Sequence, residues 1–277
     1  MNRYELWFTK QMVTNHEIQT FTEEGVVVAR QVLTTAEIKS LKKAVAAIRN
    51  NPGPLSIQLS DEKNPDGFIE DFRRWNDQKA IEDIARHSSL PHIAALLTKS
   101  SVVRFYHDHI LVRSQGNQQR TPWHQDQPYY DIDGTQTVSF WLPLDPVPIE
   151  ESIEIVAGTH TGSWMMPRTF VDKEARWFPE GSLQEVPDID KDRDSFPIRS
   201  WALEPGDAIC FSFLSLHGAP GSDKGRRTVS LRYIGDDVYR TQRSWQTSPP
   251  FPELKDPKTG LEDGEGLNHP LFPVVWP

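Results

Sequence analysis

The sequence predicts one mainly β domain with flanking helices, on the evidence of length, composition and residue pattern. Its 277 residues are a length that one β-sandwich or barrel can span. With 37% hydrophobic and 25% charged residues, the chain has the composition of an ordinary globular protein. From Val102 onward, short runs of β-branched and aromatic residues are separated by turn residues, without helical periodicity between them. This pattern is typical of antiparallel strands.

The first hundred residues are expected to form a helical support for that sheet. A capping box at Thr34 and Glu37 begins a helix that is expected to end near Asn50. Two further helices are expected at 79–87 and 91–97, the second with a proline in its first turn.

The remaining residues divide into a β core and a tail. The core is expected over 101–240, with strands at 102–112, 137–144, 153–158, 200–203, 207–214 and 228–235. A long aromatic stretch at 162–200 lacks periodicity and is expected to be a lid that contributes Trp164, Arg168 or Trp177 to a substrate pocket. The alternative for it is a packed surface insertion. Residues 241–277 are expected to be a proline-stiffened C-terminal tail that packs over the outside of the domain, and the whole of 1–277 is interpreted as a single domain.

Charge and composition argue against several classes of partner. The net charge is −9, and the basic residues are scattered rather than arranged in a stripe, so nucleic acid is not expected to bind. No stretch is long and apolar enough for a membrane helix or a signal peptide. The single cysteine, Cys210, cannot form an internal disulfide. We expect a cytoplasmic protein, either a monomer or a homodimer, that acts on a small molecule.

Three residues have the spacing and chemistry of metal ligands. His124 and Asp126 are two residues apart, so on an extended strand their side chains would project from the same face. His217 ends a second β-rich run and is followed by glycine. Two histidines and one carboxylate leave coordination positions open, as in non-haem Fe(II) oxygenases. The same ligands also suit zinc or manganese, so the triad alone does not choose the metal.

The segment after His217 adds a candidate anion-binding residue. In a strand that begins at Arg226, alternation places Arg226, Thr228, Ser230 and Arg232 on one face and Arg227 on the other. The guanidinium of Arg226 would then lie near the metal, where it could bind a carboxylate in a bidentate manner. Arg227 is expected to be an exposed residue.

Several motifs, taken together, resemble the phytanoyl-CoA dioxygenase family of Fe(II)/2-oxoglutarate oxygenases. The resemblance extends from about Thr20 to Asp237, and its motifs are WHQDQPYY (123–130), SFWLPL (139–144), AGTH (157–160), EPGD (204–207) and HGAPG (217–221), followed by Arg226-Arg227. It implies a double-stranded β-helix, also called a jelly roll or cupin-like fold. It also implies the cofactors Fe(II), 2-oxoglutarate and O2.

The resemblance also implies roles for individual residues. Iron would be held by His124, Asp126 and His217, and 2-oxoglutarate would be anchored by Arg226. Trp141 falls where the family has a tryptophan that lines the 2-oxoglutarate pocket. His109 matches a pocket-lining position more loosely, and packing or contact with the substrate are equally open roles for it. Many relatives have a serine two residues after the distal histidine, whereas this chain has Ala219. Ser230 or Thr228 would therefore have to assist Arg226.

The function implied is a dioxygenase that hydroxylates an unactivated C–H bond of a small metabolite and releases succinate and CO2. Asp126 fills the coordination site that a halide needs in halogenating relatives, so hydroxylation is favoured over chlorination. Desaturation, ring closure and epimerisation use the same triad and stay open. Two other classes are considered: a metal-dependent jelly-roll hydrolase or isomerase without 2-oxoglutarate, and a non-catalytic jelly roll that stacks a ligand on Tyr129, Tyr130 or Trp164.

Overall fold

The larger of two main sheets forms the centre of the molecule. The computed structural model describes residues 13–61, 64–166 and 183–277. Within them, eight antiparallel strands form this sheet in the order β1, β10, β7, β12, β4, β3 and β2, with β14 paired to β4. Their bounds are β1 (Val26–Ala29), β2 (Ile57–Asp61), β3 (Asn64–Phe72), β4 (Val103–Arg113), β7 (Thr137–Pro143), β10 (Ala208–Phe211), β12 (Arg226–Ile234) and β14 (Val274–Trp276).

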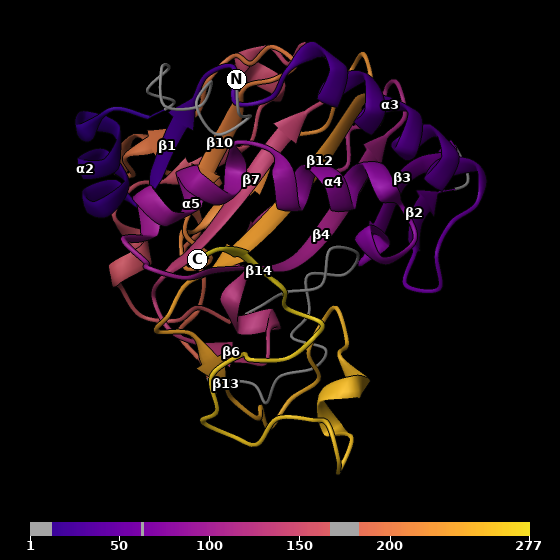
Figure 1. The fold of residues 1–277 in the computed structure, drawn as a ribbon. Helices are drawn as coiled ribbons and strands as arrows, with labels where there is room; N and C mark the ends of the chain where they lie inside the picture. The colour runs from indigo at the N-terminus through magenta and orange to yellow at the C-terminus, as the bar shows by residue number, and fades with distance from the viewer. Residues whose placement is uncertain (1–12, 62–63, 167–182) are drawn as a thin grey trace.

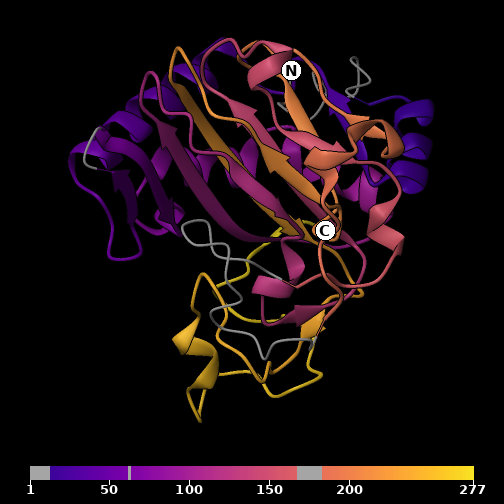
Figure 2. The ribbon, with the colours of Figure 1, turned by 180° about the vertical axis from the view of Figure 1, so that it is seen from behind.

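A smaller antiparallel sheet packs against one face of the larger one. Its strands follow the order β5 (Thr121–His124), β11 (His217–Ala219), β8 (Glu154–Val156) and β9 (Ile198–Arg199). Trp141 and Phe211 from the larger sheet share an apolar cluster with Ile155 and Ala219 from the smaller sheet. A short two-stranded sheet of β6 (Ile132–Asp133) and β13 (Tyr239–Arg240) lies at the same end of the molecule as much of the C-terminal segment (Figure 1 and Figure 2). The fold is therefore the mainly β jelly roll that was expected, with sheets that do not close into a barrel.

Helices cover the opposite face of the larger sheet, as Figure 1 shows for α4 and α5. The helices are α2 (Asn15–Glu24), α3 (Thr35–Asn50), α4 (Lys79–His87) and α5 (Leu90–Thr98). The capping box expected at Thr34 and Glu37 is present, and α3 ends at Asn50 as predicted. None of the helices in the described ranges is both long and apolar enough to cross a bilayer.

The main apolar core lies between these helices and the sheet. Leu231 and Val229 of β12 and Phe140 of β7 are fully buried there with residues from the helices. Cys210 of β10 belongs to the same cluster. The thiol is fully buried, and this burial raises the pKa of Cys210 far above its usual value. Each central strand thus has one face toward the helices and the other toward the smaller sheet.

Two secondary-structure predictions were wrong in detail. The first hundred residues are not only helical, because they contain β1, β2 and β3. β1 is a run of three valines and an alanine between two helices, and in β3 Ile69 packs against the main core while Glu70 lines the cavity on the other face. The strand expected at 200–203 is also absent. That segment leads into the Glu204–Asp207 turn, and only Leu203 forms a bridge, with Val147.

The C-terminal segment contributes to a second apolar cluster. Phe251 and Phe272 pack with Tyr106 of β4 and with Tyr130, and β14 adds to the edge of β4. Residues 241–277 are therefore partly a core element rather than only an outer covering. Of the expected lid at 162–200, residues 167–182 lie outside the described residues, and Arg168 and Trp177 lie with them. The lid stays a prediction.

Candidate metal centre and cosubstrate pocket

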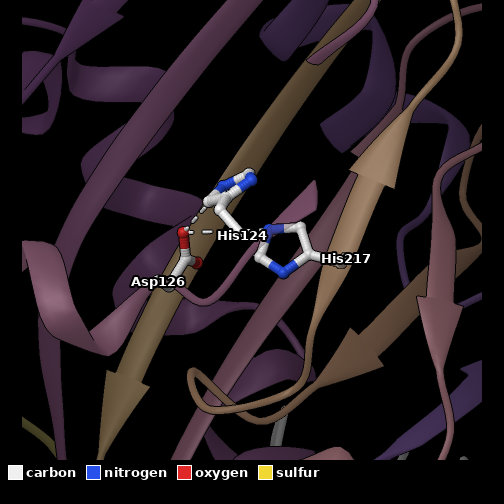
Figure 3. A group of neighbouring side chains, drawn as sticks. All are labelled: His124, Asp126 and His217. Atoms are coloured by element: carbon white, nitrogen blue, oxygen red, sulfur yellow. Dashed lines mark ion pairs between the residues drawn. The ribbon is translucent and has the colours of Figure 1, made fainter. Parts of the chain in front are cut away.

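Two histidines from neighbouring strands form the base of the candidate metal site. His124 ends β5 and His217 begins β11, and the two residues are direct cross-strand partners. Opposed residues in an antiparallel pair project from the same face, so the two imidazoles lie side by side, with ring centroids 4.2 Å apart. Figure 3 shows both rings beside the carboxylate of Asp126.

Asp126 is placed beside these histidines by a turn and not by the extended strand that the sequence suggested. β5 ends at His124, and Asp126 has helical backbone angles at the start of a 3-10 turn, Gln127–Tyr129. The expectation that both side chains project from one extended strand was therefore wrong. Asp126 Oδ1 nevertheless lies 3.7 Å from His124 Nε2 and 3.8 Å from His217 Nε2. In the part of the chain that the structure describes, this is the group whose donor atoms could hold a metal, all within 4.8 Å of one another.

Backbone carbonyls fix the orientation of both imidazole rings. His124 Nδ1 lies 2.8 Å from the Pro122 carbonyl oxygen, and His217 Nδ1 lies 2.9 Å from that of Ser215. Because a carbonyl oxygen only accepts, Nδ1 of each ring must carry the proton and donate it. Each Nε2 is then left with a lone pair, which is the form of histidine that binds a metal.

Arg232 sets the electrostatics of the site. Its guanidinium donates to Asp126 Oδ2 from Nε at 3.1 Å and from Nη2 at 2.9 Å. Burial alone would raise the pKa of the Asp126 carboxyl, but the charge and the hydrogen bonds of Arg232 hold that pKa well below its usual value. Burial, aided by His124, lowers the pKa of His217 to about 3. A carboxylate and neutral imidazoles are the ligand forms that metal binding requires, so the residues present fit a divalent iron ion.

A cavity of about 250 Å³ opens beside the three residues. Trp141, Ser230 and His109, each expected near the pocket, all line it. Trp164, expected from the lid, does not line it, and its ring instead lies under the Arg243 guanidinium, 4.7 Å from the guanidinium carbon.

Arg226 lies at the side of this site, on the predicted face of β12. Arg226, Ser230 and Arg232 are buried, while Arg227 pairs with Asp145. The Arg226 guanidinium carbon is 5.7 Å from the centre of the Trp141 ring. Arg226 lines a neighbouring cavity of about 880 Å³ rather than the one beside the metal ligands. Its guanidinium donates to the carbonyl oxygens of Glu151 and Pro220, which hold it in place.

Two polar residues of this region had no role in the sequence-based prediction. Arg232 was placed on the correct face by strand alternation, but its bond to Asp126 was not foreseen. Glu70 lines the cavity from β3, which lies in the region expected to be helical. The alternation of Phe68, Glu70 and Phe72 is the signal that could have revealed a strand with a buried carboxylate.

The family follows from comparison with known sequences. The chain matches the phytanoyl-CoA dioxygenase (PhyH) family over residues 21–228, which is more than half of its length. The chain belongs to this family. It is therefore a 2-oxoglutarate-dependent oxygenase, and its cofactors are Fe(II), 2-oxoglutarate and O2. No curated protein matches the chain at a significant level.

Solved structures share the fold of this PhyH-family protein at low sequence identity. The α-ketoglutarate-dependent carbocyclase SnoK from nogalamycin biosynthesis is 18% identical with a TM-score of 0.73, covering 95% of this chain and 96% of SnoK. The epimerase SnoN, solved with Fe3+, α-ketoglutarate and nogalamycin RO, is 18% identical with a TM-score of 0.69, covering 94% of this chain and 97% of SnoN. EctD from S. alaskensis, solved with 2-oxoglutarate and 5-hydroxyectoine, is 18% identical with a TM-score of 0.61, covering 80% of this chain and 76% of EctD.

Proposed function

We propose that this oxygenase hydroxylates an unactivated C–H bond of a small-molecule metabolite and converts 2-oxoglutarate and O2 to succinate and CO2. The observation that carries the proposal is the buried cluster of His124, Asp126 and His217 at the wall of a largely apolar cavity. One oxygen atom of O2 would enter the substrate and the other the succinate, so the reaction balances without a further reductant.

In this proposal, His124, Asp126 and His217 are the metal ligands. Iron bound to them supplies the oxidising chemistry, while the protein determines which molecules reach it and in what orientation. The carbonyls of Pro122 and Ser215 hold the imidazoles for this role. Arg232 holds the outer oxygen of Asp126, so the same carboxylate cannot rotate freely.

Arg226 is the proposed partner of the distal carboxylate of 2-oxoglutarate. Its guanidinium is buried, and no carboxylate side chain within the described ranges is hydrogen-bonded to it. Burial lowers the pKa of Arg226 to about 10, so the side chain stays positively charged at neutral pH. Trp141 and Ser230 line the cavity near it and would complete the cosubstrate pocket, because Ala219 offers no hydroxyl group.

The three solved relatives do not point to one substrate, since two come from nogalamycin biosynthesis and the third was solved with 5-hydroxyectoine, so the proposal does not name a substrate. SnoK and SnoN are described as a carbocyclase and an epimerase, and EctD was solved with 5-hydroxyectoine. A small-molecule substrate is common to the ligand-bound structures, and we extend that class to this chain. We also keep the predicted cytoplasmic location and the monomeric or homodimeric state as proposals, the second testable by light scattering.

Two measurements test the proposal in order. Adding Fe(II) and 2-oxoglutarate to the purified protein under argon should produce a weak visible charge-transfer band, which a hydrolase or a simple binding protein would not give. Succinate release in O2 across a metabolite panel should then identify a substrate, and mass spectrometry should show a product heavier by one oxygen atom. A product of unchanged mass would indicate epimerisation, and the loss of two hydrogens would indicate desaturation or ring closure. Absence of the band would contradict the assignment of the metal and cosubstrate sites.

A further inference from the structure

The cavity beside the metal ligands carries a polar pair that the proposed metal and 2-oxoglutarate sites do not use. Glu70 of β3 and His109 of β4 both line the cavity and are only 3% and 8% exposed. Glu70 Oε2 and His109 Nε2 are 3.9 Å apart. That distance is longer than a hydrogen bond, so the two groups face each other without being bonded.

Each member of this pair has a buried atom without a partner. Oε1 of Glu70 and Nε2 of His109 make no hydrogen bond within the part of the chain that the structure describes. Buried polar atoms in folded proteins are almost always paired, because an unpaired one keeps the full cost of losing water. The two residues that carry these atoms line one cavity, so a ligand group that enters between them is the partner we expect for the atoms.

Strand pairing holds both side chains in place. In the β3–β4 register, Glu70 is opposite Leu111, and Phe72 is opposite His109. The imidazole of His109 stacks on the Phe72 ring, with centroids 4.0 Å apart and an interplanar angle of 17°. The pair is thus built on two adjacent strands of the larger sheet, where side chains are positioned more exactly than on loops.

The surrounding wall is mostly apolar. The apolar side chains that line the cavity include Ile57, Leu59, Phe72, Leu111, Ile153 and Phe211. Ile57 is 40% exposed, so an apolar side chain also lies at the surface end of this wall. A ligand that fits such a wall has an apolar body, and its polar group must meet Glu70 and His109.

The charges near Glu70 decide which polar group fits. The guanidinium groups of Arg113 and Arg232 are close enough to act electrostatically on the Glu70 carboxyl, and both are buried. A ligand cation would be repelled by them, whereas an anion would be repelled by Glu70 when it is ionised. A neutral hydroxyl can both donate and accept hydrogen bonds, so it can bridge the carboxyl and the imidazole in either protonation state.

We infer that Glu70 and His109 form a subsite that binds a hydroxyl group of an otherwise apolar substrate, beside the proposed metal ligands. The subsite rests on the proposed function, since it assigns a substrate class to the same cavity. In this arrangement the substrate is an apolar alcohol, and the hydrogen bonds to Glu70 and His109 determine which carbon lies nearest the metal.

The test compares three probes of equal shape on the enzyme loaded with Fe(II) and 2-oxoglutarate under argon. The probes are decahydro-2-naphthol, its analogue with methyl in place of hydroxyl, and its analogue with an amine, and binding is measured by calorimetry. The wild type should bind the alcohol at least about 10-fold more tightly than either analogue. The methyl analogue leaves Glu70 and His109 without a hydrogen-bond partner, and the protonated amine is repelled by Arg113 and Arg232. In Glu70→Leu and in His109→Phe the preference should fall below about 3-fold, since one of the two hydrogen-bond partners of the hydroxyl is lost.

A matched control is Glu24→Gln, which alters a carboxylate that pairs with Arg199 and does not line the cavity. It should keep the wild-type preference. Equal binding of alcohol and methyl probes by the wild type, tighter binding of the amine, or no binding of the alcohol would overturn the subsite. The charge-transfer band is recorded in the same samples, so a failure of the subsite leaves the band intact, whereas a failure of the proposed function removes it.

Discussion

Strand β12 presents Val229, Leu231 and Tyr233 toward the helices. Its opposite face presents Ser230 and Arg232 to the cavity beside the metal ligands, and Arg226 to the neighbouring cavity. Both sets are buried, yet only the first is apolar. Burial of the apolar set stabilises the folded state without any specific partner. The polar set needs specific partners: Asp126 for Arg232, and backbone carbonyls for Arg226. One strand therefore serves stability on one face and chemistry on the other, and substitutions on the two faces should have separable effects.

The largest effect on activity is expected from replacing one of the proposed metal ligands beside the cavity. His217→Ala should reduce substrate-dependent succinate release to background and abolish the Fe(II)–2-oxoglutarate band, because one of three metal-binding groups is lost. Its folded state should persist, as shown by circular dichroism. Near-wild-type turnover would remove His217 from the ligand set.

Asp126→Ala separates the two roles of that carboxylate. Activity should be lost as in His217→Ala, but the protein should also lose about 3–5 kcal/mol of unfolding free energy, since Arg232 would stay buried without its partner. Urea denaturation of the metal-free proteins measures this. Equal stability of the two alanine variants would show that Arg232 finds another partner.

The next largest effect is expected on the 2-oxoglutarate requirement, and it should differ between the adjacent residues Arg226 and Arg227. Arg226→Ala should raise the 2-oxoglutarate concentration needed for half-maximal turnover by at least about 30-fold, which corresponds to about 2 kcal/mol. Arg227→Ala should change it little, because Arg227 pairs with a partly exposed Asp145 and such pairs contribute about 0–1 kcal/mol. The reverse result would place the wrong arginine at the cosubstrate.

On the helix side of the same strand, Leu231→Ala should destabilise the fold by about 2–5 kcal/mol, since Leu231 is fully buried in the main core. Turnover per folded molecule should stay close to that of the wild type at a temperature where both are folded. Loss of activity in the folded variant would show that the two faces are coupled.

The smallest effect concerns acid stability. Burial holds the pKa of His107, on the cavity side of β4, well below its usual value. As pH falls below about 6.5, the unfolded chain binds a proton that the folded chain does not, so the unfolding free energy falls. In metal-free samples, lowering the pH from 7 to 5 should reduce the unfolding free energy of the wild type. The reduction should be about 2 kcal/mol smaller in His107→Leu. Parallel losses in urea denaturation would contradict this account.

The sequence was most informative where local chemistry determines structure. The helix that follows Thr34 was predicted with its cap, since the Thr34–Glu37 pair is a local signal. Strand alternation correctly predicted which side of β12 each arginine occupies. β1 and β3 were missed, because a strand of the large sheet is determined by distant partners: β1 pairs with β10, nearly two hundred positions later.

The candidate site shows the same limit. His124, Asp126 and His217 were found from spacing and family motifs, but the turn at Asp126 was not. The bond from Arg232 to Asp126 joins residues 106 positions apart. Glu70 was missed because its role depends on the register of β3 against β4, which no local pattern determines.

The buried thiol of Cys210 gives the protein a built-in reporter of its own opening. It is the single cysteine of the chain, and it lies in the core between the sheet and the helices. A thiol reagent reacts with the thiolate in solution, so labelling requires the helical layer to separate from β10 first. The rate of labelling in native buffer therefore measures how often that layer opens. Because Phe211, the next residue, lines the cavity, the same rate recorded with and without a ligand would show whether binding on one side of the sheet restrains motion on the other.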